Sequence, residues 1–330
     1  MRPYTLRFSV SFGTDHDVKM AIQTPRWRRL VGHFDIRSET KHSQQMSRTE
    51  RAKIAEQTVE ILKRKTYSTA AGRKISIEKS LDACLNGTKV FHPDAWPNLM
   101  SEVQQKIYRR PQGKPVTISV FAETTFRTCQ RWVVDQNLEN VACLNFASAK
   151  NPGGGFLGGS QAQEEALSRA SGLYASLLRK PEYYEFNRKT GTCLYSDYMI
   201  WSPQVPIFRN DFDELLDVPY CASIITAPAV NAGCIRQNEP KKASEIKRVM
   251  VARAEKVLAL AVAQDVENLV LGAWGCGVFA NDPKEVAEIF AGLLRAGGPY
   301  ARAFTNVAFS IPSGGSSQEN WKAFSNMDWG

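Results

Sequence analysis

The sequence predicts an α/β protein with a largely parallel central sheet that is covered by helices on both faces. From residue 116 onward, short runs rich in β-branched residues alternate with helix-like stretches in βαβα order. These runs are continuously apolar, which is typical of strands buried on both faces. Glycine-rich loops follow two of the runs, at the position where ligands bind in parallel sheets.

The first third of the chain does not follow this pattern. Residues 1–45 mix Pro, Gly, Ser and Arg without sustained periodicity, so we interpret them as a basic N-terminal extension. Residues 46–114 are expected to form a helical accessory segment that packs on the core. Its first helix is expected to begin at a Ser-x-x-Glu capping box, Ser47–Glu50, ahead of amphipathic spacing up to about residue 66.

Residues 115–330 are expected to form the core domain. We expect strands at 116–122, 140–148, 198–201, 206–208, 222–229, 268–274 and 304–311. We expect helices at 124–136, 161–180, about 243–263 and 283–296. No internal repeat interrupts this order, so one sheet can accommodate all the strands.

The charge of the chain is unevenly distributed. The formal net charge is +9, and residues 1–80 hold 17 Lys and Arg against 8 Asp and Glu, whereas residues 81–330 hold 25 of each class. A basic segment attached to a neutral core indicates either contact with a polyanion or a solvated extension. No apolar run approaches the ~20 residues that a membrane helix needs, so we expect a soluble protein with no membrane contact.

The cysteines and histidines of the sequence restrict the cellular compartment of the protein and the catalytic groups that it can use. Seven scattered cysteines without a CxxC pair predict reduced thiols and an intracellular protein, cytoplasmic or, in a eukaryote, nuclear. The four histidines all lie in the first third, and the last of them is His92. Chemistry in the rest of the chain must therefore use carboxylates, thiols, hydroxyls or backbone amides.

Two glycine-rich loops are candidates for phosphate binding. The loop in 145–165 contains Gly153, Gly154 and Gly155, which let the backbone approach a phosphate closely, and a helix follows it. A second loop, 272–283, repeats this arrangement between a strand and a helix. A single glycine loop after a strand is more often an ordinary tight turn, whereas two loops at neighbouring strand ends could hold a pyrophosphate between them.

Three other interpretations of the first loop fail on context. Residues 153–158 match G-x-G-x-x-G, but the preceding strand ends too early and no acidic strand end follows at the spacing of a dinucleotide fold. Residues 158–162 approach the G-x-S-x-G nucleophile motif, but no histidine lies beyond His92 to complete a triad. Neither loop contains the GK[ST] ending of a triphosphate-binding loop.

An acidic pair, Glu164 and Glu165, follows the first loop in the first turn of the predicted helix. Successive helical side chains project about 100° apart, so one carboxylate can face a ligand while the other anchors. Acids in a first turn are also common for their favourable interaction with the helix dipole alone. Cleavage of a glycosidic bond needs a carboxylic acid to protonate the leaving oxygen, and one Glu can serve first as acid and then as base.

The residues around this pair resemble a known family. Gly153 to Gly155, a seven-residue spacer and Gln163-Glu164-Glu165 resemble the GGG-spacer-QEE signature of poly(ADP-ribose) glycohydrolases, and LNFASAKNPGGGFLGGSQAQEEALSRASGLY is similar to the microbial branch. The similarity extends from the helix near 48–66 to the strand at 304–311. The resemblance implies a macrodomain-like three-layer α/β/α fold with a mostly parallel, mixed central sheet. It also implies hydrolysis of ribose–ribose bonds in poly(ADP-ribose), with no cofactor and no metal.

The resemblance also implies roles for individual residues. Glu165 would be the catalytic acid/base, and Glu164 and Gln163 would hold the scissile ribose. Asn145 and Asn151 would bind ribose hydroxyls. The diphosphate would bind the amides of Gly153, Gly154 and Gly155 and the loop formed by Gly275, Cys276, Gly277 and Val278. Phe156 and Phe279 would pack against ribose or base.

Three functions stay open at this point. The first is an exo-acting glycohydrolase that releases ADP-ribose from chain ends, the second a non-catalytic reader of ADP-ribose, and the third a hydrolase of single ADP-ribosyl groups. The expected partners are poly(ADP-ribose) or an ADP-ribosylated protein, with ADP-ribose as the product ligand.

Overall fold

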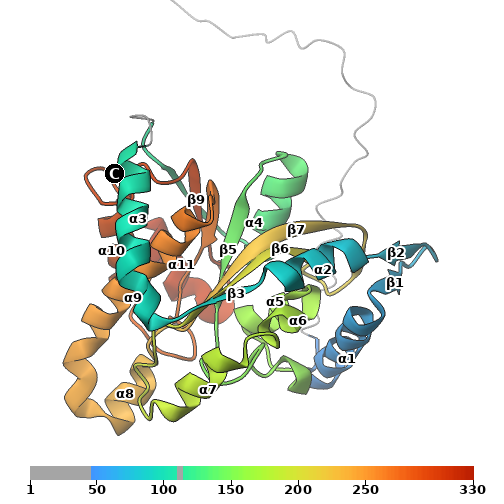
Figure 1. The fold of residues 1–330 in the computed structure, drawn as a ribbon. Helices are drawn as coiled ribbons and strands as arrows, with labels where there is room; N and C mark the ends of the chain where they lie inside the picture. Colours follow the sequence, from blue (N-terminus) through green and yellow to red (C-terminus); the bar gives the residue numbers. More distant parts are fainter. Residues whose placement is uncertain (1–45, 110–113) are drawn as a thin grey trace, which may run out of the picture. The chain divides into compact units, whose positions relative to one another are not determined.

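The computed structural model describes residues 46–109 and 114–330, and residues 46–330 form one compact unit (Figure 1). The basic extension 1–45 lies outside the described residues. The first elements are α1 (Arg48–Arg64), β1 (Thr66–Ser68), β2 (Lys74–Ser76), α2 (Glu78–Gly87), β3 (Lys89–Phe91), α3 (Trp96–Arg109), β4 (Thr117–Phe121), α4 (Thr125–Gln130), β5 (Val141–Phe146), α5 (Gln163–Ala170), α6 (Leu173–Leu177) and α7 (Pro181–Lys189). After these follow β6 (Met199–Arg209), β7 (Leu215–Ala227), α8 (Ala232–Asn238), α9 (Ile246–Ala263), β8 (Asn268–Leu271), α10 (Pro283–Leu294), β9 (Asn306–Ser310) and α11 (Gln318–Ser325).

The central sheet has seven strands in the order β3-β6-β7-β5-β8-β9-β4. The five strands from β7 to β4 are parallel, whereas β6 is antiparallel to both β7 and β3. The predicted mostly parallel, mixed sheet is therefore confirmed. The strands expected separately at 198–201 and 206–208 are one strand, β6, with an irregularity between Ser202 and Val205.

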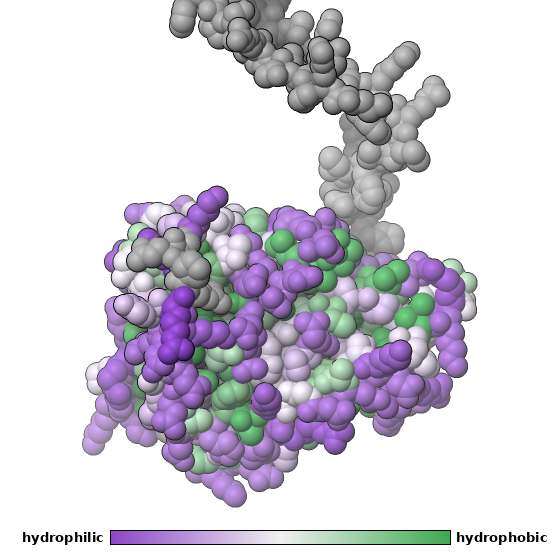
Figure 2. Space-filling view, turned by 45° about the horizontal axis from the view of Figure 1, so that its top comes forward, coloured by the Kyte–Doolittle hydropathy of each residue, from purple (hydrophilic) through white to green (hydrophobic). Residues whose placement is uncertain are grey.

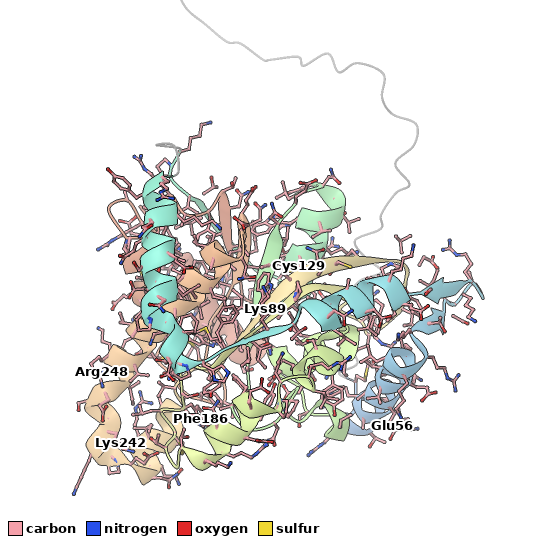
Figure 3. All side chains as sticks on the ribbon, in the orientation of Figure 1. Glu56, Lys89, Cys129, Phe186, Lys242 and Arg248 are labelled. Atoms are coloured by element: carbon pink, nitrogen blue, oxygen red, sulfur yellow. A yellow bond between two sulfur atoms is a disulfide. The ribbon has the colours of Figure 1, made fainter. Side chains whose placement is uncertain are left out.

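Helices cover both faces of the sheet, which makes a three-layer α/β/α arrangement (Figure 1). In β5, Ala142 and Leu144 pack with α3, α9, α10 and α11, while Cys143 points to the opposite cluster, formed with α4 to α7. Cys129, labelled in Figure 3, lies in this second cluster. Every residue of β5 except Phe146 is buried, as the continuous apolar pattern predicts.

The segment before the core contains both helices and strands. The capping box of α1 is confirmed: Glu50 N–H donates to Ser47 Oγ at 3.2 Å, and Ser47 N–H donates to Glu50 Oε2 at 2.7 Å. The segment also supplies the edge strand β3, whose Val90 pairs with Ile200 of β6. Its helix α3 packs against α9, so this part of the chain completes one face of the core.

The single helix predicted at 161–180 is two helices, α5 and α6, separated at Ser171 and Gly172. Ser171 is extended and forms an isolated antiparallel bridge to Ile207 of β6. A Cβ on Gly172 would lie 3.0 Å from Leu81 and 3.1 Å from Pro206, so the chain passes close to its neighbours there. Tertiary contacts with β6 break a helix that the local sequence favours.

A disulfide joins Cys193 and Cys234, whose Cα atoms are 6.0 Å apart. The expectation that all cysteines are reduced is therefore wrong for this pair. The two residues are 41 positions apart in the sequence, and only the fold brings the turn before β6 against α8. Within the described residues the other cysteines, 84, 129, 143, 221 and 276, are free.

Hydrophilic residues dominate the face shown in Figure 2, with smaller apolar patches between them. Lys242 and Arg248, labelled in Figure 3, lie near α8 and at the start of α9. None of the described helices combines the length and the apolar character that crossing a bilayer requires.

Candidate active site

The two glycine loops begin side by side at the carboxyl edge of the sheet. β5 and β8 are adjacent parallel strands, and the loops follow directly after Phe146 and Leu271. A Cβ on Gly272 would lie 2.9 Å from the ring of Phe146, so the start of the second loop touches the end of β5. The expectation that the loops occupy neighbouring strand ends is confirmed.

Gly154 brings the first loop against the acidic pair. Its φ is +60°, and a Cβ at this position would lie 2.4 Å from Glu165 Oε1 and 3.2 Å from Glu164 Oε2. Only glycine combines this left-handed backbone with so close an approach. A larger residue at position 154 would therefore collide with the two carboxylates.

The backbone amides of the loop donate to protein groups in this structure. Gly155 N–H donates to Glu165 Oε1 at 2.9 Å, and the N–H of Gly153 is hydrogen-bonded to Glu164. Gly154 N–H donates to the carbonyl of Asn151 at 3.0 Å. We expected these three amides to bind a diphosphate, but here they hold the loop against the acidic pair and close a turn.

Glu164 is buried and hydrogen-bonded through both oxygens. Its side chain accepts from Asn145 Nδ2 at 3.2 Å and from Ser148 N–H at 2.6 Å. Burial raises the pKa of Glu164 to about 8, although the Ser148 and Asn145 donors act in the opposite direction. The Glu164 carboxyl group therefore takes up a proton at a higher pH than an exposed glutamate does.

Glu165 is the partly exposed member of the pair. Its one protein donor is Gly155 N–H, which bonds Oε1, so among the described residues Oε2 has no partner. The two carboxylates thus differ as the helical geometry predicts: one is anchored in the core and one is accessible.

Gln163 and Asn145 attach the start of α5 to the sheet. Gln163 accepts from Phe146 N–H at 2.8 Å and donates to the carbonyl of Leu144 at 2.7 Å, so it bonds to β5 as a neighbouring strand would. Asn145 is fully buried and also donates to Thr226 Oγ1 at 3.2 Å. Asn145 Oδ1 is buried with no partner among the described residues.

The first residues of the second loop pack against the core, whereas the amides that follow them are unpaired. A Cβ on Gly275, whose φ is +76°, would lie 2.5 Å from Ala229, and Asn281 Nδ2 donates to the carbonyl of Gly275 at 3.0 Å. By contrast, the N–H groups of Gly277, Val278 and Phe279 have no hydrogen-bond partner within residues 46–109 and 114–330. These amides are free donors for an anion.

The two aromatic residues predicted to contact the ligand, Phe156 and Phe279, differ in exposure. Phe156 has no exposed surface and packs edge-on against Tyr174, with ring centroids 4.7 Å apart. In this conformation its ring supports the first loop from beneath. Phe279 is partly buried and lies 5.9 Å from the ring of Tyr195. Asn151 is exposed at the start of the first loop, where its N–H donates to Ser148 Oγ.

Sequence reasoning missed Ser148 and Tyr195. Ser148 donates its backbone N–H to Glu164, and Tyr195 adopts a positive φ of 57°, packs against Phe279 and is hydrogen-bonded to Asn231. Ser148 lies within the stretch that resembles the family, but no local pattern marks it as a partner of Glu164, and Tyr195 belongs to no quoted motif. Tyr183 and Tyr184, in α7, are both buried.

Cys276 is a poor nucleophile in this environment. Burial raises the pKa of its thiol, and no histidine among the described residues lies beyond His92 to remove the proton. Its backbone N–H donates to the carbonyl of Ala273 at 3.1 Å. The residue therefore acts as a small member of the loop.

Within residues 46–109 and 114–330, one set of side chains has the spacing of metal ligands: Cys193, Cys234 and Glu239. The two sulfurs are bonded to each other. Glu239 accepts from Lys242 Nζ at 2.7 Å and Thr192 Oγ1 at 2.6 Å, and these bonds lower its pKa to about 2. The carboxylate is therefore already neutralised by the protein.

Comparisons with known proteins agree with this geometry. A family model described as the catalytic domain of microbial-type poly(ADP-ribose) glycohydrolase matches residues 55–210. The structure is similar to a poly(ADP-ribose) glycohydrolase from Thermomonospora curvata, with a TM-score of 0.78, 43% identity and coverage of 84% of this chain and 98% of that one. No curated protein sequence matches the chain.

Two further similar structures contain ligands. The Thermomonospora curvata enzyme bound to the inhibitor ADP-HPD gives a TM-score of 0.75 at 42% identity, over 84% of this chain and 98% of that chain. The enzyme from Deinococcus radiodurans in complex with ADP-ribose gives 0.68 at 43% identity, over 74% and 95%. With this identity across nearly the whole of those proteins, the chain belongs to the microbial-type poly(ADP-ribose) glycohydrolase family.

Proposed function

We propose that this protein is a poly(ADP-ribose) glycohydrolase in which Glu165 is the general acid and base. The observation that carries the proposal is the asymmetry of the acidic pair. Glu164 is buried and hydrogen-bonded through both oxygens, whereas Glu165 is partly exposed and its Oε2 has no partner in the described part of the chain. One carboxyl group is therefore accessible to a substrate at the start of a helix that follows a glycine loop.

In the proposed reaction, the Glu165 carboxyl protonates the glycosidic oxygen while the bond from that oxygen to the anomeric carbon breaks. The ribose passes through an oxocarbenium-like state. The Glu165 carboxylate then accepts a proton from water as the water oxygen bonds to the anomeric carbon. Glu164 and Gln163 set the position of Glu165, and the unpaired Oδ1 of Asn145 is an acceptor for a ribose hydroxyl.

The diphosphate is assigned mainly to the second glycine loop. Gly277, Val278 and Phe279 present unpaired amides there, and Val278 is 87% exposed, so an anion can reach them. Gly275 and Cys276 form the supported base of this loop. Phe279, braced by Tyr195, is the aromatic ring placed to pack against ribose or base.

The test is turnover of poly(ADP-ribose) by wild type and Glu165→Gln, measured as release of free ADP-ribose. General acid–base assistance is worth about 10²- to 10⁴-fold, so this variant should lose most turnover and retain ADP-ribose affinity. Glu78→Gln is a matched control, because Glu78 lies in the first turn of α2, outside the site. Binding without turnover by wild type would indicate a reader, and turnover restricted to single ADP-ribosyl groups would indicate the alternative hydrolase.

The proposal includes two further details: the enzyme cleaves from the ends of the polymer, and residues 1–45 contact a polyanion. Exo cleavage predicts ADP-ribose as the first product, without intermediate oligomers. The excess positive charge of the N-terminal quarter supports contact with the phosphates of the polymer. Early accumulation of short oligomers would contradict the exo mode while leaving the glycohydrolase activity intact.

A further inference from the structure

The first glycine loop ends in a short turn, Phe156–Gly158 followed by Gly159, that faces the first helix of the described chain. Two arginines of α1 donate to its last two carbonyls. Arg48 Nε donates to the carbonyl of Gly158 at 2.8 Å, and Arg51 Nε donates to the carbonyl of Gly159 at 2.8 Å. A guanidinium donor makes a charge-assisted hydrogen bond, which is stronger than a neutral one.

The helix and the turn meet backbone to backbone. Gly159 has a φ of +74°, and a Cβ there would lie 1.9 Å from the carbonyl oxygen of Arg48 and 3.1 Å from the backbone nitrogen of Ala52. No residue other than glycine permits this approach. The contact is therefore part of the packing of the fold, and Figure 1 shows α1 lying beside α5 and α6.

The same helix is also bonded to α5, which carries the acidic pair. Thr58 Oγ1 of α1 donates to the carbonyl of Arg169 at 2.6 Å, and Arg169 donates through Nη1 to the carbonyl of Ser160 at 3.1 Å. Arg169 itself is 3% exposed and pairs with Asp213. α1, the turn and α5 are thus each hydrogen-bonded to the other two.

One turn of chain separates the arginines from the proposed catalytic carboxylate. Gly158 and Ser160 both donate their N–H groups to the carbonyl of Gly155, at 3.0 and 3.2 Å, and the N–H of Gly155 donates to Glu165 Oε1 at 2.9 Å. A shift of the Gly158–Gly159 carbonyls therefore moves the peptide that holds Glu165. Arg51 is the better anchored arginine, because it is partly buried and also donates to the carbonyl of Met46.

We propose that Arg51, assisted by Arg48, is a positioning residue for Glu165 and acts through the Gly155–Gly159 turn. Both arginines precede residue 55, where the match to the family model begins. The inference rests on the proposed role of Glu165, but the loop contact can be measured separately. In this proposal α1 covers the core and also fixes the position of the Glu165 carboxylate.

The test compares Arg51→Ala, Arg51→Lys and Arg64→Ala. Arg64 lies on the same helix, and its side chain is 72% exposed and pairs among the described residues with Glu60 alone, so its variant removes the same charge without touching the turn. Misplacement of a reacting group by about 1 Å can cost up to ~100-fold, so we expect Arg51→Ala to lower kcat about 10- to 100-fold with little change in KM. Arg51→Lys should recover part of kcat, whereas Arg64→Ala should match wild type in kcat.

A second measurement separates this inference from the proposed function. Hydrogen exchange of the peptide 153–165 should be faster in Arg51→Ala than in Arg64→Ala, whether or not the protein cleaves the polymer. Equal exchange and equal kcat in these two variants would overturn the positioning role. Faster exchange in Arg51→Ala, with no cleavage by wild type, would retain the loop contact and reject the glycohydrolase instead.

Discussion

Glu164 and Glu165 are consecutive residues with the same side chain, yet they have different surroundings. Asn145 and Ser148 hold Glu164 in the core, while Glu165 accepts from Gly155 N–H at the edge of the glycine loop. Pairs of carboxyl groups in unlike environments are typical of sites that divide anchoring from acid–base work. The division follows from the 100° step of the helix combined with the position of β5.

The raised pKa of Glu164 predicts a pH-dependent stability. Its folded value of about 8 exceeds the unfolded value of 4.5, so the protonated group favours the folded state below pH ~4.5, and this contribution is lost as pH rises through 8. Each pKa unit corresponds to ~1.4 kcal/mol. Glu164→Gln, which cannot ionise, should therefore gain in Tm relative to wild type between pH 5 and pH 8.

Glutamine also loses one acceptor for the Asn145 and Ser148 donors, which adds an offset that does not depend on pH. The slope of the Tm difference against pH is therefore the informative quantity. A difference that stays constant from pH 5 to pH 8 would show that Glu164 has an ordinary pKa in the folded protein.

Gly154→Ala should reduce activity out of proportion to stability. The left-handed φ at this position costs any L-residue ~1–2 kcal/mol, and the new methyl group would displace the Glu165 carboxylate, which is 2.4 Å away. Gly191→Ala is a matched control, because Gly191 has a φ of +64° with nothing within 4 Å. Both variants should lose similar unfolding free energy in urea, but only Gly154→Ala should lose kcat, by at least ~10-fold. Equal kcat in both variants would count against the assigned position of Glu165.

At the scale of elements, the local sequence pattern predicts well where a strand or helix forms. It predicts poorly which other elements that strand or helix contacts. The strand at 140–148 and the helix at 283–296 are present as β5 and α10, because continuous apolar runs and amphipathic spacing are local signals. The helix at 161–180 is interrupted, because Ser171 pairs with Ile207 of a strand that comes later in the chain. Gly172 at this break weakens the helix locally, but it does not predict the pairing with Ile207.

The disulfide between Cys193 and Cys234 predicts a stability that depends on oxidation. Closing a loop of 41 residues restricts the unfolded chain, and the chain-entropy model gives about 4 kcal/mol for this length. The double variant Cys193→Ser/Cys234→Ser should lose up to this amount in urea unfolding of the oxidised protein. Reductant should lower the stability of wild type and leave the double variant unchanged. A wild type that is insensitive to reductant would mean that the bond contributes little.

At the scale of the whole molecule, the N-terminal extension and the compact unit share the excess positive charge: residues 1–45 hold 8 Lys and Arg against 4 Asp and Glu, and residues 46–80 hold 9 against 4. The excess of Lys and Arg lies in residues 1–80, and the remaining residues are balanced. Residues 46–330 form the compact unit that contains both glycine loops and the acidic pair. Truncation at residue 45 therefore removes only part of the excess charge and leaves both glycine loops and the acidic pair in place.

Deletion of residues 1–45 should weaken binding of poly(ADP-ribose) more at low salt than at high salt. A basic segment on a polyanion releases counterions, so its contribution decreases as the salt concentration rises. The measurement is polymer affinity across a salt series for the full chain and the truncated chain, with free ADP-ribose as the control ligand. Parallel salt slopes for the two proteins would assign the extension no role in polymer binding.

The sequence by itself determined the α/β class, the two glycine loops and the Gln163–Glu165 triplet with its family resemblance. These features are contiguous in the chain and depend on local periodicity and composition. Only the tertiary structure decided which glutamate is buried, which amides are occupied and that Cys193 meets Cys234. It also decided that Arg48 lies on the carbonyl of Gly158, 110 positions away. Such contacts depend on how separated segments pack, and no local pattern encodes that.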